Sequence, residues 1–145
     1  MSAVGTFLAL SRDERWLLLR AAGAVLFVRV AFAFWSTARL RAWAQQGRRG
    51  RLGIDRIAWA VSAASRRLPG ATCLVSGLAL QRLLSREGHA SELHIGVAKL
   101  GERLAAHAWV VCEGRTLIGE VESGDYTRLV AWRAAGPSGG PPPSA

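Results

Sequence analysis

Lysine is nearly absent from this sequence, in which Lys99 is the only lysine among 19 basic residues. The formal net charge of +9 at pH 7 therefore comes almost wholly from arginine. We attribute it to a bias in composition at least as much as to selection for binding a polyanion. No recognised motif for reading nucleic acid accompanies the charge, so we expect no nucleic-acid partner.

Cysteine is also scarce, since Cys73 and Cys112 are the only two in the chain. Two cysteines make no disulfide framework, and the first is better suited to act as a thiol. A zinc site that combined them with His107 would lack the close spacing of zinc ligands. The sequence shows no phosphate-binding motif, internal repeat or signal peptide pattern. We therefore expect a cytoplasmic protein without a metal or cofactor.

The length of 145 residues, half of them hydrophobic, predicts one domain with its own core. Residues 1–48 are expected to form an apolar helical segment, and a polar, glycine-bearing linker follows it. Residues 54–133 are expected to form the core. Residues 134–145 have no large apolar side chain to bury, so they are predicted to be a disordered tail.

Two helices are predicted before the middle of the chain. The first extends over residues 11–43, where Ser11 serves as N-cap and Glu14 completes a capping box. The second begins at Asp55 and ends at the Pro-Gly pair of residues 69–70, which breaks the helical pattern.

The first of these helices contains a long apolar run. Residues 21–38 carry Arg29 as their only charge, and the run nearly reaches the length that spans a bilayer. An arginine in mid-membrane costs about 2.5–3.5 kcal/mol even on the lenient insertion scale. We therefore favour a helix buried against the domain or a partner. Membrane association through residues 16–43 remains the alternative.

Residues 73–88 are predicted to form a central helix, because leucine and alanine lie on all of its sides. Thr72 offers a side-chain cap, and Arg86 and Gly88 suit the C-terminal end. Cys73 therefore lies in the first turn, where the helix dipole and unpaired backbone N–H groups favour a thiolate. This position makes Cys73 a candidate nucleophile.

The second half of the chain alternates apolar and polar residues, which predicts strands. Three strands are expected over residues 91–98, 105–112 and 115–122, and a fourth over residues 126–132. The order of helices and then strands predicts an α+β fold. We expect the central nucleophile helix to pack on a small antiparallel sheet, preceded by the N-terminal helices.

Alternation along the second strand places His107 on one face and Cys112 on the other. If a two-residue turn follows Cys112, counting outward along the hairpin places His107 opposite Glu120, with Cβ atoms about 4.5–5.5 Å apart. A slip of one residue would turn Glu120 to the other face. Glu122 is the alternative carboxylate on the same side, and Asp125 is a more distant alternative.

Cys73, His107 and Glu120 together suit nucleophilic acyl chemistry. The thiolate attacks a carbonyl, the histidine accepts and returns the proton, and the carboxylate fixes the imidazole tautomer. This assignment expects the central helix to present Cys73 to the face of the hairpin that carries His107. Each residue also has a structural interpretation, as a buried cysteine, a core histidine and a cross-strand partner.

Two stretches carry a family resemblance. Residues 66–88, RRLPGATCLVSGLALQRLLSREG, and residues 105–120, AAHAWVVCEGRTLIGE, resemble the transglutaminase-like cysteine peptidases of lasso peptide biosynthesis. These are the B-type maturation proteins, here in the stand-alone protease form. The similarity covers residues 54–132, and FLALSRDERWLLLRAA resembles the helical lead-in of that family.

The resemblance implies a papain/transglutaminase-like core in which Cys73 is the nucleophile and His107 the general base. The third family residue is usually an acid on the following strand, often an aspartate. Here the twelfth residue after His107 is Gly119, and Glu120 comes next. The pairing count therefore favours Glu120 as the third member, with Glu122 as the alternative.

The resemblance also implies a function and partners. Proteins of this family remove the leader from a ribosomally made lasso precursor peptide through an acyl-enzyme. The sequence shows no winged-helix leader-recognition domain, so a separate leader-recognition protein is implied, together with an asparagine-synthetase-like lasso cyclase. Two alternatives stay open: a transglutaminase-like acyltransferase, and a catalytically silent membrane or scaffold component.

Overall fold

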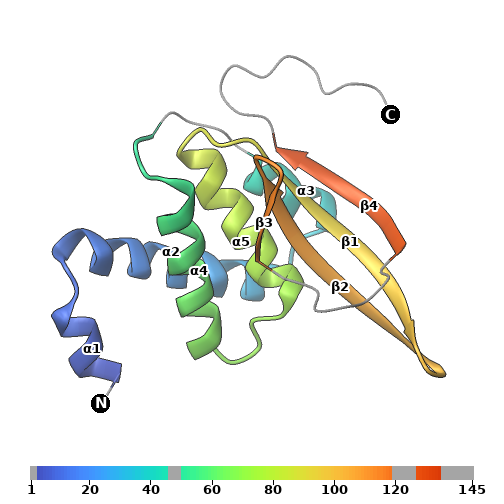
Figure 1. Cartoon of the computed structure of the whole chain (residues 1–145), viewed down its shortest axis with the longest axis horizontal. Coiled ribbons are helices and arrows are strands. Elements are labelled where there is room, and N and C mark those ends of the chain that lie inside the picture. Colours follow the sequence, from blue (N-terminus) through green and yellow to red (C-terminus); the bar gives the residue numbers. More distant parts are fainter. Residues whose placement is uncertain (1–2, 46–49, 119–126, 135–145) are drawn as a thin grey trace.

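The computed structural model describes residues 3–45, 50–118 and 127–134 of the chain. Within them, five helices precede four strands, which confirms the predicted α+β fold (Figure 1). The elements are α1 (Ala3–Ala9), α2 (Arg12–Ala31), α3 (Thr37–Ala44), α4 (Ile54–Arg67), α5 (Cys73–Arg86), β1 (Ser91–Leu100), β2 (Arg103–Cys112), β3 (Arg115–Ile118) and β4 (Thr127–Ala134).

The N-terminal helix starts as predicted and ends earlier. Ser11 caps α2, since the backbone N–H of Glu14 donates to Ser11 Oγ at 3.2 Å and the Glu14 carboxylate accepts from the Ser11 backbone at 2.9 Å. The prediction of one helix over residues 11–43 is wrong, because α2 ends at Ala31 and Ser36 caps a separate helix, α3. The break allows the Phe27 ring to contact Trp43, with 4.7 Å between centroids.

Only one face of α2 is buried. Its buried residues repeat every three or four positions, and they are Leu17, Ala21, Val25, Val28 and Ala31. Leu19, Leu26 and Val30 lie on the remaining surface and are exposed. The expectation of a helix that packs against the domain therefore holds for one face of α2. Among the described residues, no helix has the length and hydropathy needed to cross a membrane.

The strands form one antiparallel sheet in the order β3-β2-β1-β4, and α5 packs on it (Figure 1). The last strand extends to Ala134, which is buried, so Ala134 does not belong to the predicted tail. The rest of that tail lies outside the described residues. The placement of α5 on the sheet confirms the predicted central helix.

The ends of α5 agree with the sequence prediction. Thr72 Oγ1 accepts from the backbone N–H of Val75 at 3.3 Å. At the other end Gly88 has φ of +83°, a conformation in which glycine is favoured, and Arg86 lies in the last turn. Between these ends Leu78, Leu80 and Leu84 are fully buried. The nucleophile candidate is thus the first residue of the best-buried helix.

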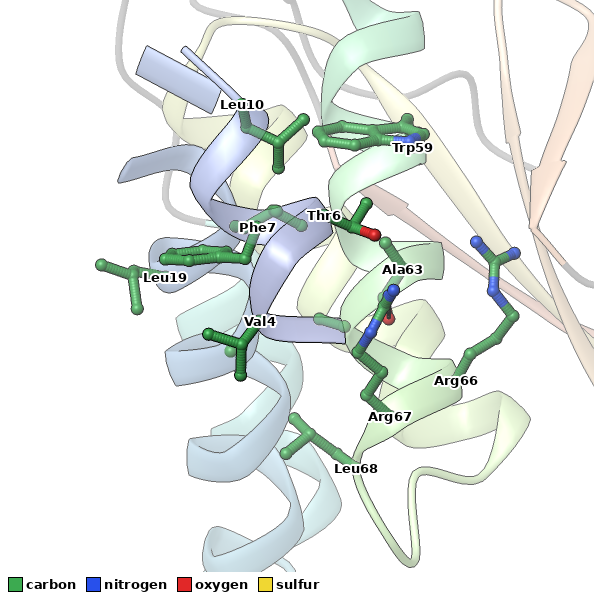
Figure 2. A pocket seen from close by; sticks show the side chains of 13 residues that line it. Val4, Thr6, Phe7, Leu10, Leu19, Trp59, Ala63, Arg66, Arg67 and Leu68 are labelled. Atoms are coloured by element: carbon green, nitrogen blue, oxygen red, sulfur yellow. Dashed lines mark hydrogen bonds between the residues drawn. The ribbon is translucent and has the colours of Figure 1, made fainter. Parts of the chain in front are cut away.

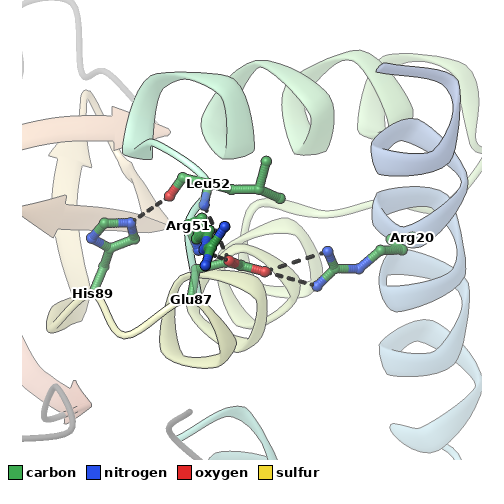
Figure 3. A network of polar contacts seen from close by, with 5 residues as sticks. All are labelled: Arg20, Arg51, Leu52, Glu87 and His89. Atoms are coloured by element: carbon green, nitrogen blue, oxygen red, sulfur yellow. Dashed lines mark hydrogen bonds and ion pairs between the residues drawn. The ribbon is translucent and has the colours of Figure 1, made fainter. Parts of the chain in front are cut away.

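A carboxylate holds the segment before α4 against the end of α5 (Figure 3). Glu87 accepts hydrogen bonds from the backbone N–H groups of Arg51 at 2.9 Å and Leu52 at 3.2 Å, and from Arg20 at 3.4 Å. His89 Nε2 donates to the carbonyl of Leu52 at 2.7 Å. These bonds join α2, the segment before α4 and the C-terminal end of α5.

Gly77 allows α5 to approach the sheet closely. A Cβ atom on Gly77 would lie 2.7 Å from Leu93 Cδ1 and 3.5 Å from Val110 Cγ2. We expect Gly77→Ala to lower the free energy of unfolding by about 1–3 kcal/mol, because the side chains below must shift. Urea denaturation followed by circular dichroism measures this change.

Gly23 provides the matched control for that substitution. It lies inside α2, is exposed, and has no atom within 4 Å of an added Cβ. Gly23→Ala should therefore raise stability by about 0.5–1 kcal/mol, since alanine is the better helix former. Equal effects of the two substitutions would contradict the close contact at Gly77.

Candidate active site

Cys73 is the first residue of α5, and its side chain is half-buried. The backbone N–H groups in the first turn of a helix have no intrahelical partner, and the helix dipole is positive there. Thr72 satisfies only one of these groups, that of Val75. The first turn of α5 therefore offers backbone N–H groups and the positive end of the helix dipole to negative charge that develops beside Cys73.

The Cys73 side chain lines an open hollow of about 450 Å³ between α4, α5 and β3. Serine and threonine side chains, a single arginine and small apolar groups make up its wall. The lining residues are Ser62, Ser65, Arg66, Ala71, Cys73, Ser76, Thr116, Leu117 and Ile118. Ser76 Oγ donates to Ser65 Oγ at 2.8 Å. Such a surface offers hydrogen bonds to a polypeptide backbone placed next to the thiol.

Cys112 has a different environment, as the sequence predicts. It is 2 % exposed, and its Sγ donates to the carbonyl of Ala90 at 3.2 Å. Burial raises the pKa of the Cys112 thiol, and the neighbouring Glu113 charge raises it further. Cys112 thus stays a protonated core thiol near neutral pH. In the described part of the chain, no three His, Cys, Asp or Glu residues could hold a metal ion.

The contrast between the two thiols predicts selective alkylation. At pH 7.5, iodoacetamide should modify Cys73 at least about tenfold faster than Cys112, because thiolate and access are both needed for reaction. Peptide mapping of the alkylated protein gives the two rates, and the same reaction in urea shows that both thiols are reactive once exposed. Equal rates in the folded protein would contradict the assigned environments.

His107 lies on the face of β2 that points away from α5. Ala108 and Val110 alternate with it and are buried, and Val110 lies beside Gly77 of α5 together with Leu93. Within the described residues, no hydrogen bond or ion pair joins Cys73 to His107. The expectation that α5 packs on the His107 face is therefore wrong. Small apolar side chains occupy that interface, and strict alternation turns His107 to the other side.

On that outer face the His107 ring belongs to a stack of aromatic rings. Its centroid lies 6.3 Å from that of Trp109, which lies 5.5 Å from that of His94 on β1. His94 Nε2 is 2.8 Å from the Glu92 carboxylate, and Arg128 lies 3.5 Å from His94 Nδ1. The stack holds His107 in a defined position beside a charged cluster.

The turn of the hairpin agrees with the prediction, and its register does not continue as counted. Cys112 pairs with Arg115, which confirms the two-residue turn. Val111 then pairs with Thr116 as counted, but the register shifts by one residue at the next position, so that Val110 pairs with Ile118. The extra residue is the kind of bulge that re-aims the side chains beyond it. An unbroken count therefore cannot be extended from this turn to His107.

The predicted carboxylates fall outside this description. Glu120 and its alternatives Glu122 and Asp125 all lie in residues 119–126, which are not among the described residues. The assignment of any of them as third catalytic residue stays a prediction from the sequence.

The sequence prediction missed Arg66, Ser65 and Ser76 beside Cys73. A signal existed for the serines, because Ser62 and Ser65 are three residues apart and so share one face of α4. The sequence does not show that this face packs against α5. That follows only from the structure, in which Ser65 of α4 contacts Ser76 of α5.

Comparison with known proteins gives one match. Residues 16–131 match the family model described as the transglutaminase-like superfamily. The match begins in α2 and ends in β4, so it includes Cys73, His107 and the first three strands of the sheet. No curated protein and no solved structure matches the chain.

Proposed function

The chain belongs to the transglutaminase-like superfamily, and from this we propose that it is a cysteine peptidase that removes the leader from a lasso peptide precursor. The observation that carries the proposal is the position of Cys73, half-buried at the start of α5 and open to a hollow. The superfamily model supports cysteine peptidase or acyltransfer chemistry. The assignment to lasso peptide maturation rests on the likeness of residues 66–88 and 105–120 to that family.

In the proposed reaction, the Cys73 thiolate attacks the carbonyl carbon of the scissile peptide bond. The amine of the core peptide leaves with a proton from His107, and the leader remains as a thioester on Cys73. His107 then takes a proton from water as the water attacks the thioester, which releases the leader acid and regenerates the thiol. Glu120 is proposed to hold the imidazole in the required tautomer.

The proposal requires His107 and Cys73 to approach each other when substrate binds. Catalytic hydrogen bonds are often long or poorly aligned without substrate and tighten in the complex. A peptide that fills the hollow would contact β3, which pairs with the strand that carries His107. Strict alternation places His107 on the face of β2 that points away from α5, so its role in the reaction rests on the family likeness.

The proposed partners follow from the family likeness. A precursor peptide supplies the leader, a separate leader-recognition protein presents it, and an asparagine-synthetase-like cyclase closes the ring. All of these are expected in the cytoplasm, where the precursor is made. Membrane association through residues 16–43 remains a second proposal, supported by the exposed apolar side chains of Leu26, Val30 and Phe34.

The mass of the products tests the reaction. The protein is incubated with a candidate precursor and its leader-recognition protein, with and without an added amine. A leader fragment with the mass of the free acid indicates hydrolysis, and one that carries the amine indicates an acyltransferase. An intact precursor under all conditions would overturn the proposal in favour of a silent scaffold.

A further inference from the structure

A second hollow lies on the other side of α4 from the sheet. It has a volume of about 440 Å³ and is bounded by α1, α2 and α4 (Figure 2). Its wall is apolar, with Phe7 and Leu10 from the first helix and its following turn, Leu19 from α2, and Trp59 and Ala63 from α4. Leu19 is 56 % exposed and Trp59 is 40 % exposed, so both side chains remain accessible to a ligand. We call this hollow the apolar groove.

Arg66 connects the apolar groove to the hollow that contains Cys73, because it lines both. Figure 2 shows its side chain extending from α4 on the side away from α1. Arg66 is exposed and makes no hydrogen bond or ion pair within the described residues. Its neighbour Arg67 also lines the groove, and there it donates to the carbonyl of Ala63 at 3.2 Å. A cationic group thus stands between an apolar surface and the nucleophile.

We propose that Arg66 is a specificity residue that binds an acidic side chain of the peptide substrate. In this arrangement the apolar side chains next to that acid fill the groove, and the scissile carbonyl lies at Cys73. The inference rests on the proposed peptidase function, whose substrate class it narrows to peptides with an acidic residue beside apolar ones. A planar guanidinium matches a carboxylate with two parallel hydrogen bonds.

Three observations favour a peptide as the ligand of the apolar groove and the adjoining Cys73 hollow. The hollow beyond Arg66 carries hydroxyl groups on Ser62, Ser65 and Ser76, which suit the amides of a polypeptide. Its far wall is β3, which is one of the two edge strands of the sheet in the described residues, and edge strands bind extended peptides. The net charge of +9 attracts an acidic segment.

The experiment selects binders from a displayed library of random twelve-residue peptides, using the full chain with Cys73→Ala. Peptides recovered should be enriched in Asp or Glu next to apolar residues. Adding Arg66→Gln should reduce that acidic enrichment about tenfold, because the charge-assisted pair is lost. Adding Arg103→Gln removes the same charge from an exposed arginine that lines neither hollow, and it should leave the enrichment unchanged.

A second pair of variants tests the groove. Leu19→Glu places a charge at its wall and should remove the apolar preference while the protein stays folded, since Leu19 is exposed. Leu129→Glu on β4 is the control, because this position is 64 % exposed. This variant should retain the preference for apolar residues in the selected peptides. Circular dichroism of each variant confirms that the fold is intact.

Several results would overturn the inference. These are a library without acidic enrichment, an enrichment that Arg66→Gln leaves unchanged, and Arg66-dependent binding of decanoate or of phosphatidylglycerol vesicles with no peptide selected. Selection with the Cys73→Ala variant needs no catalysis, so the two proposals can fail separately. Acidic peptides that bind and stay intact with Cys73 present would overturn only the peptidase. A cleavage rate that Arg66→Gln leaves unchanged would overturn only the specificity role of Arg66.

Discussion

Replacing Cys73 with alanine should abolish release of the leader. Without the thiol there is no nucleophile to form the acyl-enzyme, so kcat/KM should fall by at least about 10³-fold. Chromatography with mass detection of the leader fragment measures the rate. The folded structure should remain, because Cys73 is only half-buried and its side chain makes no hydrogen bond within the described residues.

Cys112→Ala is the control for that loss. The substitution removes a buried sulfur and its bond to Ala90, so it should cost about 1–2 kcal/mol of stability. Its kcat/KM should stay within about twofold of the unmodified chain below the unfolding temperature, since the residue does not line the hollow. A Cys73→Ala variant that still releases leader, or a Cys112→Ala variant that is folded and inactive, would contradict the assignment.

Replacing His107 with alanine should have the second-largest effect. Loss of a general acid and base lowers kcat/KM by about 10²–10⁴-fold. The proposed role is in proton transfer, so substrate binding to the variant should change little. The kcat and KM values obtained from initial rates separate these contributions, and the loss should appear in kcat.

His94→Gln provides the matched control, because His94 belongs to the same ring stack on the outer face of the sheet. It should lower stability through loss of the contact with Glu92 and leave kcat within a few-fold. If both histidine variants lose activity equally, the stack supports the fold of the site and His107 is not the base.

The parts of this fold that were predictable from sequence are those set by local chemistry. Ser11 and Glu14 form the predicted capping box because its bonds span only three residues. Thr72 and Gly88 mark the ends of α5 for the same reason. The hairpin turn at residues 113–114 is likewise local, and Cys112 pairs with Arg115 as predicted.

The parts that were not predictable depend on contacts distant in sequence. The sequence after Arg29 stays apolar through Trp35, yet α2 ends at Ala31, and the Phe27 ring contacts Trp43 of α3. The bulge between Val110 and Val111 has no glycine or other sequence signal, although it shifts the register on which Glu120 was assigned. The proposed role of Arg66 depends on the packing of α4 against α2 and α5.

The central claim is that the Cys73 thiol forms a thioester with the leader, and the mass of the quenched protein tests it most directly. A reaction with precursor is stopped with acid within the first turnover, digested with trypsin and mapped. The account predicts a leader adduct on the peptide of residues 68–82, which contains Cys73, and none on residues 104–115, which contain Cys112. Leader released without any adduct on residues 68–82, or an adduct on residues 104–115, would contradict it.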